Sequence, residues 1–518
     1  MLRDLQKLSE PRRSERAQVV IVGGGIAGLM AAARLARKGI RSIVLESGNA
    51  TCGTEPDPLN EVVQAGQLHR GALSGRFRGL GGTSLRWGGA MLPFLPCDLE
   101  EHTAGWPVAW PLRIGQLESH FREIETIFGL PQGLFEVHDD PPGGLNPSFV
   151  LRSAKLPPFS RRNVATTLRQ RLASPNADIW LNATVTDFRL NDAGRVAGVT
   201  AMSPSGARLD VESATIIVAA GAIESTRLLL LLDARNNHRI FAPDGQLGRY
   251  FFDHLAGPAA NIFAAPGSGL NETFGLRFVR SGMRDLRMEA DVKLRRDLKL
   301  PGAFAQVRAL SDDCNAFAAL RAICLDLQSR SQIRSEHVRQ LGRDFKWIAR
   351  AGYWRFIKGR LLAPRNSLFE LTLVIEQWPS ASNTISLAAD RQDAYGVPLA
   401  RLSWQVNPQD CQTFNKFQSL VTSYWTSRFT ALGILEPTPP HVSHEQLRRS
   451  PDFFHPGGTT RMSSHALNGV VDANLRTHRI PNLYVVSTSS FPSGGGSNPT
   501  FMLMAFALRA AEHVQSSM

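Results

Sequence analysis

The chain has 518 residues, of which 43% are hydrophobic and 20% are charged, and its formal net charge is +13. This composition excludes a disordered protein, and the length exceeds what one hydrophobic core usually holds, so two lobes are expected. The sequence has no run of about eighteen apolar residues, which excludes a membrane-spanning helix.

The first residues and the cysteines bear on the compartment. Residues 1–7 contain no apolar stretch of the kind that a cleaved secretion signal needs. Five scattered cysteines, odd in number and without metal-ligand spacing, favour reduced thiols in a cytoplasmic protein. We therefore expect no metal site, and we expect residues 1–15 to form a disordered N-terminal arm.

A dinucleotide-binding signature follows directly. Residues 19–22 form an apolar run that predicts a buried strand of a parallel sheet. The G-x-G-x-x-G motif of residues 23–28 leads into a helix that ends near Lys38, and residues 42–45 predict the next strand, which closes with Glu46. A strand, three glycines, a helix, a strand and a terminal acid in this order indicate a nucleotide site rather than a simple loop.

Each residue type in this signature has a physical reason. Gly23 makes the tight turn, Gly25 lets the backbone approach a pyrophosphate, and Gly28 allows close packing of helix on strand. The free amides at the helix start, around Ile26 and Ala27, can hold the anion. Glu46 can accept a hydrogen bond from a ribose hydroxyl group, and the motif alone does not choose between NAD and FAD.

A second glycine cluster lies at residues 78–89. It is long and glycine-rich for a connection, and its amides could line a flat bound ring. A mobile surface loop is the alternative, although the apolar residues Leu80 and Leu85 argue against full solvation. The candidate cofactor contacts in this cluster are Gly82, Thr83, Ser84, Trp87, Gly88 and Gly89.

The middle of the chain predicts a return to the parallel sheet and then a different sheet. Residues 180–185 and 214–225 indicate a strand and a strand–turn–helix unit, and residues 188–199 indicate a hairpin. Between about 256 and 450 the strands alternate apolar and polar residues more strictly, as in residues 371–376. That pattern favours a separate mixed or antiparallel sheet with one open face, suited to a substrate.

Much of the excess positive charge lies between Arg330 and Arg365, where ten Lys or Arg residues face only two acids. Val338, Leu341, Phe345 and Ile348 follow a helical spacing, and aromatic residues accompany the charges. A basic amphipathic segment can lie on an anionic bilayer. A helix that packs on the core with a solvated basic side is the alternative, and nucleic acid is disfavoured because no recognition module accompanies the charge.

Two glycine-rich loops near the C-terminal end each present one polar side chain. Residues 454–462 carry His455, and residues 494–500 carry Asn498 just before an apolar helix expected over 501–514. A strand is expected between the two loops, at 482–486. An imidazole that can take a proton and an amide that can donate a hydrogen bond suit chemistry on a hydroxyl group.

These blocks, in this order, resemble the glucose–methanol–choline (GMC) family of FAD-dependent oxidoreductases, particularly its pyranose-oxidase-like and choline-dehydrogenase-like members. The resemblance runs nearly from end to end and is most specific in the tail. The blocks that carry it are the fingerprint ending at Glu46, residues 81–89, Trp106-Pro107, residues 219–225, Gly248–Tyr250, Asp253-His254, Glu376-Gln377 and residues 455–500.

The resemblance implies an α/β fold with two lobes. One is a Rossmann-like FAD-binding lobe with a parallel sheet and helices, and the other is an α+β substrate lobe with a mostly antiparallel sheet. The expected boundaries are 16–105, 165–255 and 452–518 for the FAD-binding domain, and 106–164 and 256–451 for the substrate-binding domain.

The resemblance also implies roles for single residues. His455 would accept the proton of a substrate alcohol near the flavin N5, and Asn498 would hold the substrate oxygen. Pro499 and Thr500 would approach the pyrimidine edge of the flavin. The remaining implied FAD contacts are Val185 near the adenine, Ala220, Gly221 and Ser489, and Asn498 is an implied FAD contact as well.

Two positions depart from the family pattern. Some members carry, directly before the loop tryptophan, a histidine that bonds covalently to FAD, and this chain has Arg86 there. We therefore expect FAD to be bound non-covalently. The residue after Arg461-Met462 is usually glycine and is Ser463 here, which leaves the local turn open without touching His455.

The expected activity is oxidation of a CH–OH group of an alcohol, sugar or polyol, with oxygen, a quinone or a carrier protein as electron acceptor. Two other classes stay open. A non-redox lyase on the same scaffold would use His455 as a plain base. A peripheral membrane or polyanion-binding flavoprotein would have the segment 330–365 as its main functional surface.

Overall fold

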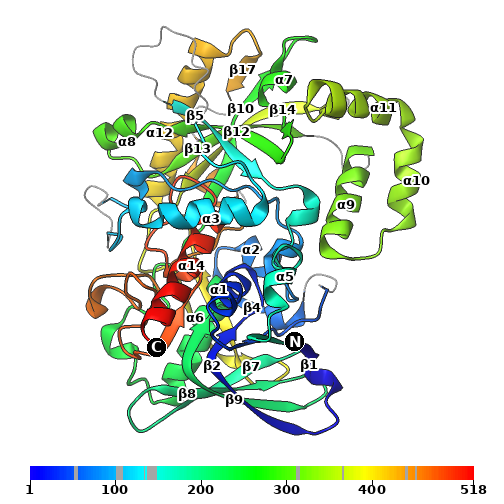
Figure 1. Ribbon diagram of the computed structural model, residues 1–518. Helices are drawn as coiled ribbons and strands as arrows, with labels where there is room; N and C mark the ends of the chain where they lie inside the picture. Colours follow the sequence, from blue (N-terminus) through cyan, green and yellow to red (C-terminus); the bar gives the residue numbers. More distant parts are fainter. Residues whose placement is uncertain are drawn as a thin grey trace.

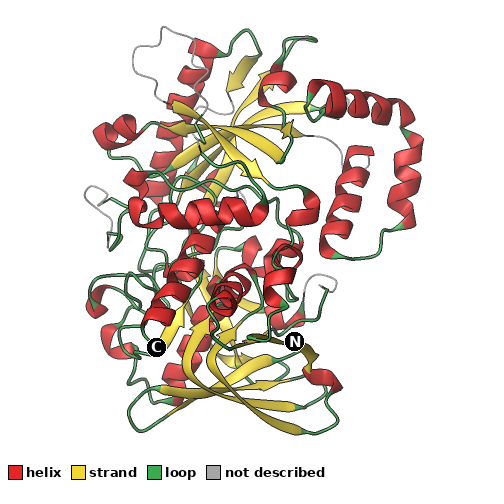
Figure 2. Ribbon diagram, viewed as in Figure 1, coloured by secondary structure: helices red, strands yellow, loops and turns green. Residues whose placement is uncertain are grey.

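The computed structural model describes residues 1–51, 57–100, 109–133, 135–136, 149–310, 316–364, 367–437, 442–449 and 452–518. Trp106-Pro107, one block of the resemblance, lies outside the described residues. Two large sheets dominate the molecule and lie at opposite ends of the view in Figures 1 and 2. Both marked chain ends lie beside the lower sheet.

The lower sheet, sheet A, has eight strands in the order β1-β6-β3-β2-β9-β8-β7, with β18 paired to β9. Its strands are β1 (Leu2–Asp4), β2 (Arg12–Val22), β3 (Ser42–Leu45), β6 (Ala177–Leu181), β7 (Thr184–Leu190), β8 (Val196–Met202), β9 (Arg208–Val218) and β18 (Leu483–Val485). Parallel pairing joins β2 to both β3 and β9, whereas β7, β8 and β9 form an antiparallel meander. The Rossmann-like parallel sheet and the hairpin expected from the sequence are confirmed.

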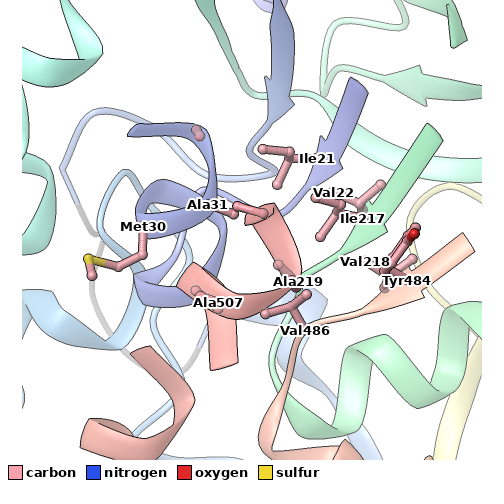
Figure 3. Close-up of a cluster of buried hydrophobic side chains, with 14 of the residues drawn as sticks. Ile21, Val22, Met30, Ala31, Ile217, Val218, Ala219, Tyr484, Val486 and Ala507 are labelled. Carbon is pink, nitrogen blue, oxygen red and sulfur yellow. The ribbon is translucent and has the colours of Figure 1, made fainter. Parts of the chain in front are cut away.

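The first and last segments of the chain share one hydrophobic core. Helix α1 (Ile26–Arg37) packs against helix α14 (Thr500–Ser516), and buried side chains from both helices meet those of β2, β9 and β18 (Figure 3). Small buried residues such as Ala31 and Ala507 let the two helices approach closely. This packing places the loop before α14 beside the turn before α1.

The upper sheet, sheet C, is antiparallel, as the alternating pattern predicts. Its seven strands are β5 (Phe149–Leu156), β10 (His254–Phe263), β11 (Arg277–Val279), β12 (Gly282–Ala290), β13 (Ala303–Leu310), β14 (Leu368–Glu376) and β17 (Ile434–Pro437). Helix α12 (Pro408–Arg428) contacts β10, β14 and β17 and buries Phe414, Phe417 and Trp425. The opposite end of this sheet approaches the C-terminal loops.

A third, three-stranded sheet joins segments that lie far apart in the sequence. Its strands are β4 (Val62–Gly66), β15 (Thr384–Gln392) and β16 (Pro398–Trp404), and β16 pairs with both of the others. Outside the helical segment of residues 316–364, the other α-helices of the described residues are α2 (Arg70–Leu73), α3 (Glu118–Phe128), α4 (Val164–Thr167), α5 (Arg169–Leu172), α6 (Ala222–Arg235), α7 (Leu270–Phe274), α8 (Val292–Leu298) and α13 (His444–Arg449). The domain boundaries expected from the sequence stay a prediction.

The first fifteen residues differ from the expected disordered arm. β1 adds to the edge of sheet A by pairing with β6, and Leu5 is fully buried. The amino group of Met1 donates to the carbonyl of Ala177 at 2.6 Å. β2 begins at Arg12, seven residues before the apolar run, because its parallel pairing with β9 continues through exposed polar positions. An apolar pattern does not report strand residues that are held by backbone pairing alone.

Residues 316–364 form a projecting helical arm, which lies at the right of Figure 1. It contains α9 (Ala316–Ser329), α10 (Ser335–Arg343), α11 (Phe345–Tyr353) and a π-helical turn, η8 (Trp354–Lys358). The sequence pattern predicted one helical stripe through Val338 and Phe345, and this stripe is wrong. The Asp344 side chain accepts a hydrogen bond from the Trp347 amide and starts a new helix. Val338 and Phe345 therefore lie on different helices, and both are exposed.

Candidate active site

The turn between β2 and α1 has the backbone that the glycine motif requires. Gly23 adopts φ +108°, and a Cβ there would lie 2.5 Å from the Ala219 carbonyl oxygen. A Cβ on Gly28 would lie 2.0 Å from the Gly23 oxygen, so this glycine allows the helix to touch the strand. α1 begins after Gly25 without a side-chain cap, which leaves its first amides for an anion.

Glu46 closes β3 beside this turn. One carboxylate oxygen accepts from the Gly24 amide at 2.7 Å, and the other accepts from the amides of Gly48 and Gly79 at 2.8 and 3.0 Å. Burial raises the pKa of the Glu46 carboxyl, although these amides and the charge of Arg78 act in the opposite direction. The carboxylate thus links the two glycine loops and still faces the cavity described next.

One cavity collects residues from the beginning, middle and end of the chain. The predicted cofactor residues that line it are Gly23, Gly25, Ile26, Ala27, Glu46, Gly82, Thr83, Trp87, Val185, Ala220, Gly221, Pro499 and Thr500, and His455 lines it as well. Gly25 and Gly221 leave it open, because a Cβ on Gly221 would meet nothing within 4 Å and one on Gly25 would meet only Gly82, at 3.9 Å.

The other predicted cofactor residues do not line the cavity. Ser84 is buried and its hydroxyl donates to the Gly81 carbonyl oxygen, and Gly89 packs against Arg162. Gly88 is exposed. Ser489 accepts a hydrogen bond from the Thr460 hydroxyl and is fully buried. These residues and Gly28 belong to the segments around the cavity, but their atoms do not line it.

Sequence reasoning missed two arginines and an acid that line the same cavity. Arg76 and Arg78 both approach Glu224, at 3.5 and 3.1 Å, and Arg78 also donates to the Ser47 hydroxyl at 2.7 Å. Burial lowers the pKa of Arg76 to about 10. Arg78 is the first residue of the second glycine cluster and Arg76 lies two residues before it, and this position was the available signal.

His455 and Asn498 meet, although 43 residues separate them. The Asn498 Nδ2 atom lies 2.9 Å from His455 Nε2. His455 is half-buried and lines the cavity, whereas Asn498 does not line it and stands at the end of the loop that leads to α14. The two C-terminal loops thus bring an imidazole and a carboxamide within hydrogen-bond distance of each other.

Arg287, on β12 of sheet C, joins this pair and had no sequence signal. Its Nη1 donates to Asn498 Oδ1 at 2.5 Å, while its guanidinium lies 4.4 Å from the centre of the Phe304 ring and approaches Asp285 at 3.4 Å. The side chain is 3% exposed. A single arginine in a strand of a distant sheet carries no motif, so only the fold could reveal it.

The hydrogen bonds around His455 agree with one set of protonation states. Because Arg287 donates to the amide oxygen, the Asn498 nitrogen faces His455 and donates to Nε2. The proton of a neutral His455 then sits on Nδ1, which is 3.3 Å from His254 Nδ1. His254 Nε2 in turn donates to the Gly495 carbonyl oxygen at 2.8 Å. Nε2 of His455 is thus the free basic nitrogen.

Burial lowers the pKa of His455 well below its usual range, and the neighbouring His254 and Arg287 lower it further. The imidazole is therefore neutral near pH 7 and able to accept a proton. A base in this state fits chemistry that begins by removing a proton.

The backbone of His455 is held by a buried carboxylate. Asp253 accepts from the His455 amide with both oxygens, at 2.9 and 3.0 Å, and from His69 Nε2 at 3.1 Å. His69 also lies 3.7 Å from Asp452, which accepts from the amides of Arg70 and Gly71. His69, Asp253 and Asp452 together fix the loop that presents His455.

The cavity residues fit FAD. Uncapped amides at the start of α1 suit a pyrophosphate, the Glu46 carboxylate suits a ribose hydroxyl group, and the open walls at Gly25 and Gly221 admit a ligand backbone. At the other end His455, Trp87 and Thr500 surround space for a flat ring. A Rossmann-like sheet with this cavity, in a chain that also forms an antiparallel sheet, defines an α/β protein of the dinucleotide-binding class.

Comparison with family models identifies the family. Residues 158–256 and 379–507 match two models described as GMC oxidoreductase, and residues 21–63 match a model of an NAD(P)-binding Rossmann-like domain. The chain belongs to the GMC oxidoreductase family. Membership implies an FAD-dependent oxidoreductase.

Several curated proteins are similar along nearly the whole chain. A 2-methyl-1,2-propanediol dehydrogenase of Mycolicibacterium austroafricanum is 22% identical and aligns over 97% of this chain and 95% of its own length. A paromamine 6'-oxidase of Streptomyces fradiae is 23% identical, with 96% and 91% covered. A fructose dehydrogenase large subunit of Gluconobacter japonicus is 21% identical, with 96% and 97% covered.

Solved structures show the same fold. A pyridoxine 4-oxidase from Mesorbium loti superposes with a TM-score of 0.58 at 19% identity, covering 96% of this chain and 99% of the other. A formate oxidase from Aspergillus oryzae superposes with a TM-score of 0.58 at 16% identity, covering 97% and 98%.

Proposed function

We propose that this chain oxidises a CH–OH group of an alcohol, sugar or polyol with FAD bound in the cavity between its terminal segments. The observation that carries this proposal is the hydrogen bond between Asn498 and the unprotonated Nε2 of His455, at the end of a cavity that fits FAD. Relatives named as dehydrogenases and oxidases of hydroxyl-bearing compounds support the reaction class.

Residues at both ends of the cavity would hold the cofactor. The first amides of α1, with Gly25, Ile26 and Ala27, would bind the pyrophosphate, and Glu46 would bind a ribose hydroxyl group. The ring would lie beside Thr83, Trp87 and Pro499. When bound, FAD supplies a hydride acceptor at its N5 atom.

His455 would act as the base. A substrate hydroxyl group placed between His455 and Asn498 would replace their direct hydrogen bond, donate its proton to Nε2 and accept a hydrogen bond from the Asn498 amide. Arg287 would fix the orientation of that amide, and its positive charge would favour the developing alkoxide. Loss of the hydroxyl proton would strengthen hydride donation from the adjacent carbon.

We propose that the FAD is not covalently attached through the position before Trp87. Arg86 occupies that position and lies 3.8 Å from Asp326, and a guanidinium is not a suitable nucleophile. Acid precipitation should leave all of the yellow colour in the supernatant. Colour retained in the washed pellet would contradict the proposal.

The unpaired thiols of Cys97, Cys324 and Cys411 support a reducing, cytoplasmic location. The electron acceptor is kept open among oxygen, a quinone and a carrier protein.

Anaerobic mixing with a panel of sugars, polyols, sterols and aliphatic alcohols tests the reaction. We expect at least one class to bleach the yellow absorbance of the oxidised flavin. Readmission of oxygen or addition of a quinone would then separate an oxidase from a dehydrogenase. No bleaching by any class would contradict the proposal.

The alternative is a lyase on the same scaffold. The lowered pKa of His455 supports it, since a base that acts without flavin reduction would also need a neutral imidazole. Formation of a product while the flavin stays oxidised, under the same anaerobic conditions, would establish the lyase and remove the oxidase.

A further inference from the structure

The helical arm carries an apolar stripe that no other described part of the chain covers. Phe345, Tyr353 and Phe356 follow one another at helical spacing along α11 and η8, and Ile357 lies beside them. Their exposed fractions are 73%, 54%, 80% and 69%. Large apolar side chains grouped at this density on a surface indicate an interaction site rather than scattered exposure.

The opposite side of the same helix packs against the rest of the arm. Trp347 is 2% exposed and forms a small core with Ala316 and Leu362, against which Ile348 and Trp354 pack. The exposed stripe is therefore a second face of a helix that is already anchored. Its orientation is fixed, and the stripe does not serve the arm's own folding.

Cations flank the stripe. Lys346 and Arg350 are exposed one helical turn apart beside Phe345, and neither forms an ion pair with a described acidic side chain. Arg355 lies 3.7 Å from the centre of the Phe278 ring, and Lys358 pairs with Glu272 at 2.9 Å. Apolar rings between basic side chains match the boundary between acyl chains and anionic headgroups.

The arm also touches the second glycine cluster, residues 78–89. The Gln328 side chain at the end of α9 donates to the carbonyl oxygens of Ser84 and Trp87, at 3.0 and 3.1 Å. Asp326 on the same helix lies 3.8 Å from Arg86. A surface that the arm holds is thus connected by direct contacts to the loop beside the proposed flavin site.

We propose that the stripe formed by Phe345, Tyr353, Phe356 and Ile357, with Lys346, Arg350 and Arg355, is a docking surface for an anionic lipid bilayer. The apolar side chains enter the headgroup boundary and the cations contact lipid phosphates. The protein contains no helix, among the described residues, that could cross a membrane. Docking through this surface would hold residues 78–89 at a constant distance from the bilayer.

Vesicle flotation of the full-length protein with its flavin tests the proposal. The wild type should float with vesicles of equal parts phosphatidylcholine and phosphatidylglycerol, and it should not float with phosphatidylcholine alone. Each lost charge should weaken partitioning about fivefold, so Lys346→Gln with Arg350→Gln should weaken it roughly 25-fold. Phe345→Ser with Phe356→Ser should weaken it at least about tenfold.

A charge-matched control uses exposed arginines at the far end of sheet A, Arg16→Gln with Arg195→Gln, which should float as the wild type does. All variants change exposed residues, and an unchanged flavin content would establish that they fold. Equal flotation of the arm variants and the control, or no flotation of the wild type, would overturn the proposal. A wild-type dimer that the Phe345 and Phe356 variant dissociates, without lipid binding, would replace the bilayer by a second copy of the chain. These outcomes do not depend on alcohol oxidation.

Discussion

At the scale of single residues, the chemistry rests on a histidine whose basic nitrogen is defined by its neighbours. Asn498 donates to Nε2, and His254 accepts from Nδ1, so both ring nitrogens have assigned roles. The sequence predicted His455 and Asn498 because each stands in a glycine-rich loop. It could not predict Arg287, whose contact with Asn498 depends on the placement of a strand from another sheet.

Replacing His455 tests the proposed base. His455→Asn should lower the rate of flavin reduction by about 10² to 10⁴, because it removes the nitrogen that accepts the hydroxyl proton in the proposed reaction. Flavin content should stay unchanged, since no predicted phosphate contact is lost. Stopped-flow reduction with the best substrate measures the rate. His478→Asn, which loses only a contact to the Ser463 carbonyl, is the control, and a rate within tenfold of wild type would exclude the role.

Replacing Arg287 tests its action on the base. A positive charge beside His455 disfavours the imidazolium, so its removal should raise the pKa of His455. The acid limb of the kcat/KM profile should therefore move to higher pH in Arg287→Met and remain nearly in place in Arg287→Lys. The rate at the optimum should fall by up to about a hundredfold as the Asn498 amide loses its fixed orientation. A rate loss with an unmoved limb would assign Arg287 a purely structural role.

The same histidine should make stability depend on pH. Its pKa is lower in the folded than in the unfolded state, so the unfolded chain binds more protons below pH 6.5, the ordinary value. Stability should be complete above that pH and decline as the pH falls below it. Chemical denaturation from pH 7.5 to 5.5 should show a decline in the wild type that is smaller in His455→Asn. Equal slopes would contradict the lowered pKa.

At the scale of elements, the fingerprint and the terminal helix follow the predicted order because their apolar patterns and glycines are local. Strand residues that are held by long-range backbone pairing were not predicted from the sequence. The polar start of β2 and the β1 edge strand are stabilised by backbone partners in β9 and β6, which leave no apolar pattern. In the helical arm, one capping aspartate, Asp344, divides a helix that side-chain spacing alone had joined.

Two glycines of one motif should respond differently to alanine. A Cβ on Gly25 has space, so Gly25→Ala should fold normally but bind FAD at least about tenfold more weakly, since the methyl group enters the proposed phosphate path. A Cβ on Gly28 would collide with the Gly23 oxygen, so Gly28→Ala should destabilise the apoprotein by roughly 1–3 kcal/mol. Titration calorimetry and denaturant unfolding separate the two effects. Gly342→Ala, in open space on the arm, is the control. Similar apoprotein stabilities for the two motif variants would contradict this assignment.

At the scale of the whole molecule, sequence patterns predicted the two classes of sheet but not the way they meet. His455 and Asn498 belong to the tail that completes sheet A, whereas Arg287 comes from sheet C, and their contact requires both lobes in place. The alternating pattern of a strand fixes which face is buried, not which neighbouring lobe it will touch. The third sheet, which pairs β4 with β16, is likewise visible only in the fold.

Cofactor binding should stabilise the molecule as a whole. Residues near both ends of the chain and from its middle build the cavity wall. A thousandfold excess of FAD over its Kd should therefore add about 4 kcal/mol to the free energy of unfolding. The unfolding midpoint should rise by several degrees relative to the apoprotein. Riboflavin, which lacks the pyrophosphate and adenosine, should raise it less. Thermal unfolding by circular dichroism measures both shifts. Equal shifts for the two flavins would contradict the roles proposed for the start of α1 and for Glu46.

The pairing of β18 with β9 and the packing of α14 on α1 also set an order of events during synthesis. The ribosome releases residues 483–516 long after 19–45, and the loop that carries Asn498 lies within that late segment. A nascent chain that lacks it has neither a closed core around α1 nor a complete wall for the flavin. We therefore expect FAD to bind only after residues 483–516 have been synthesised and packed.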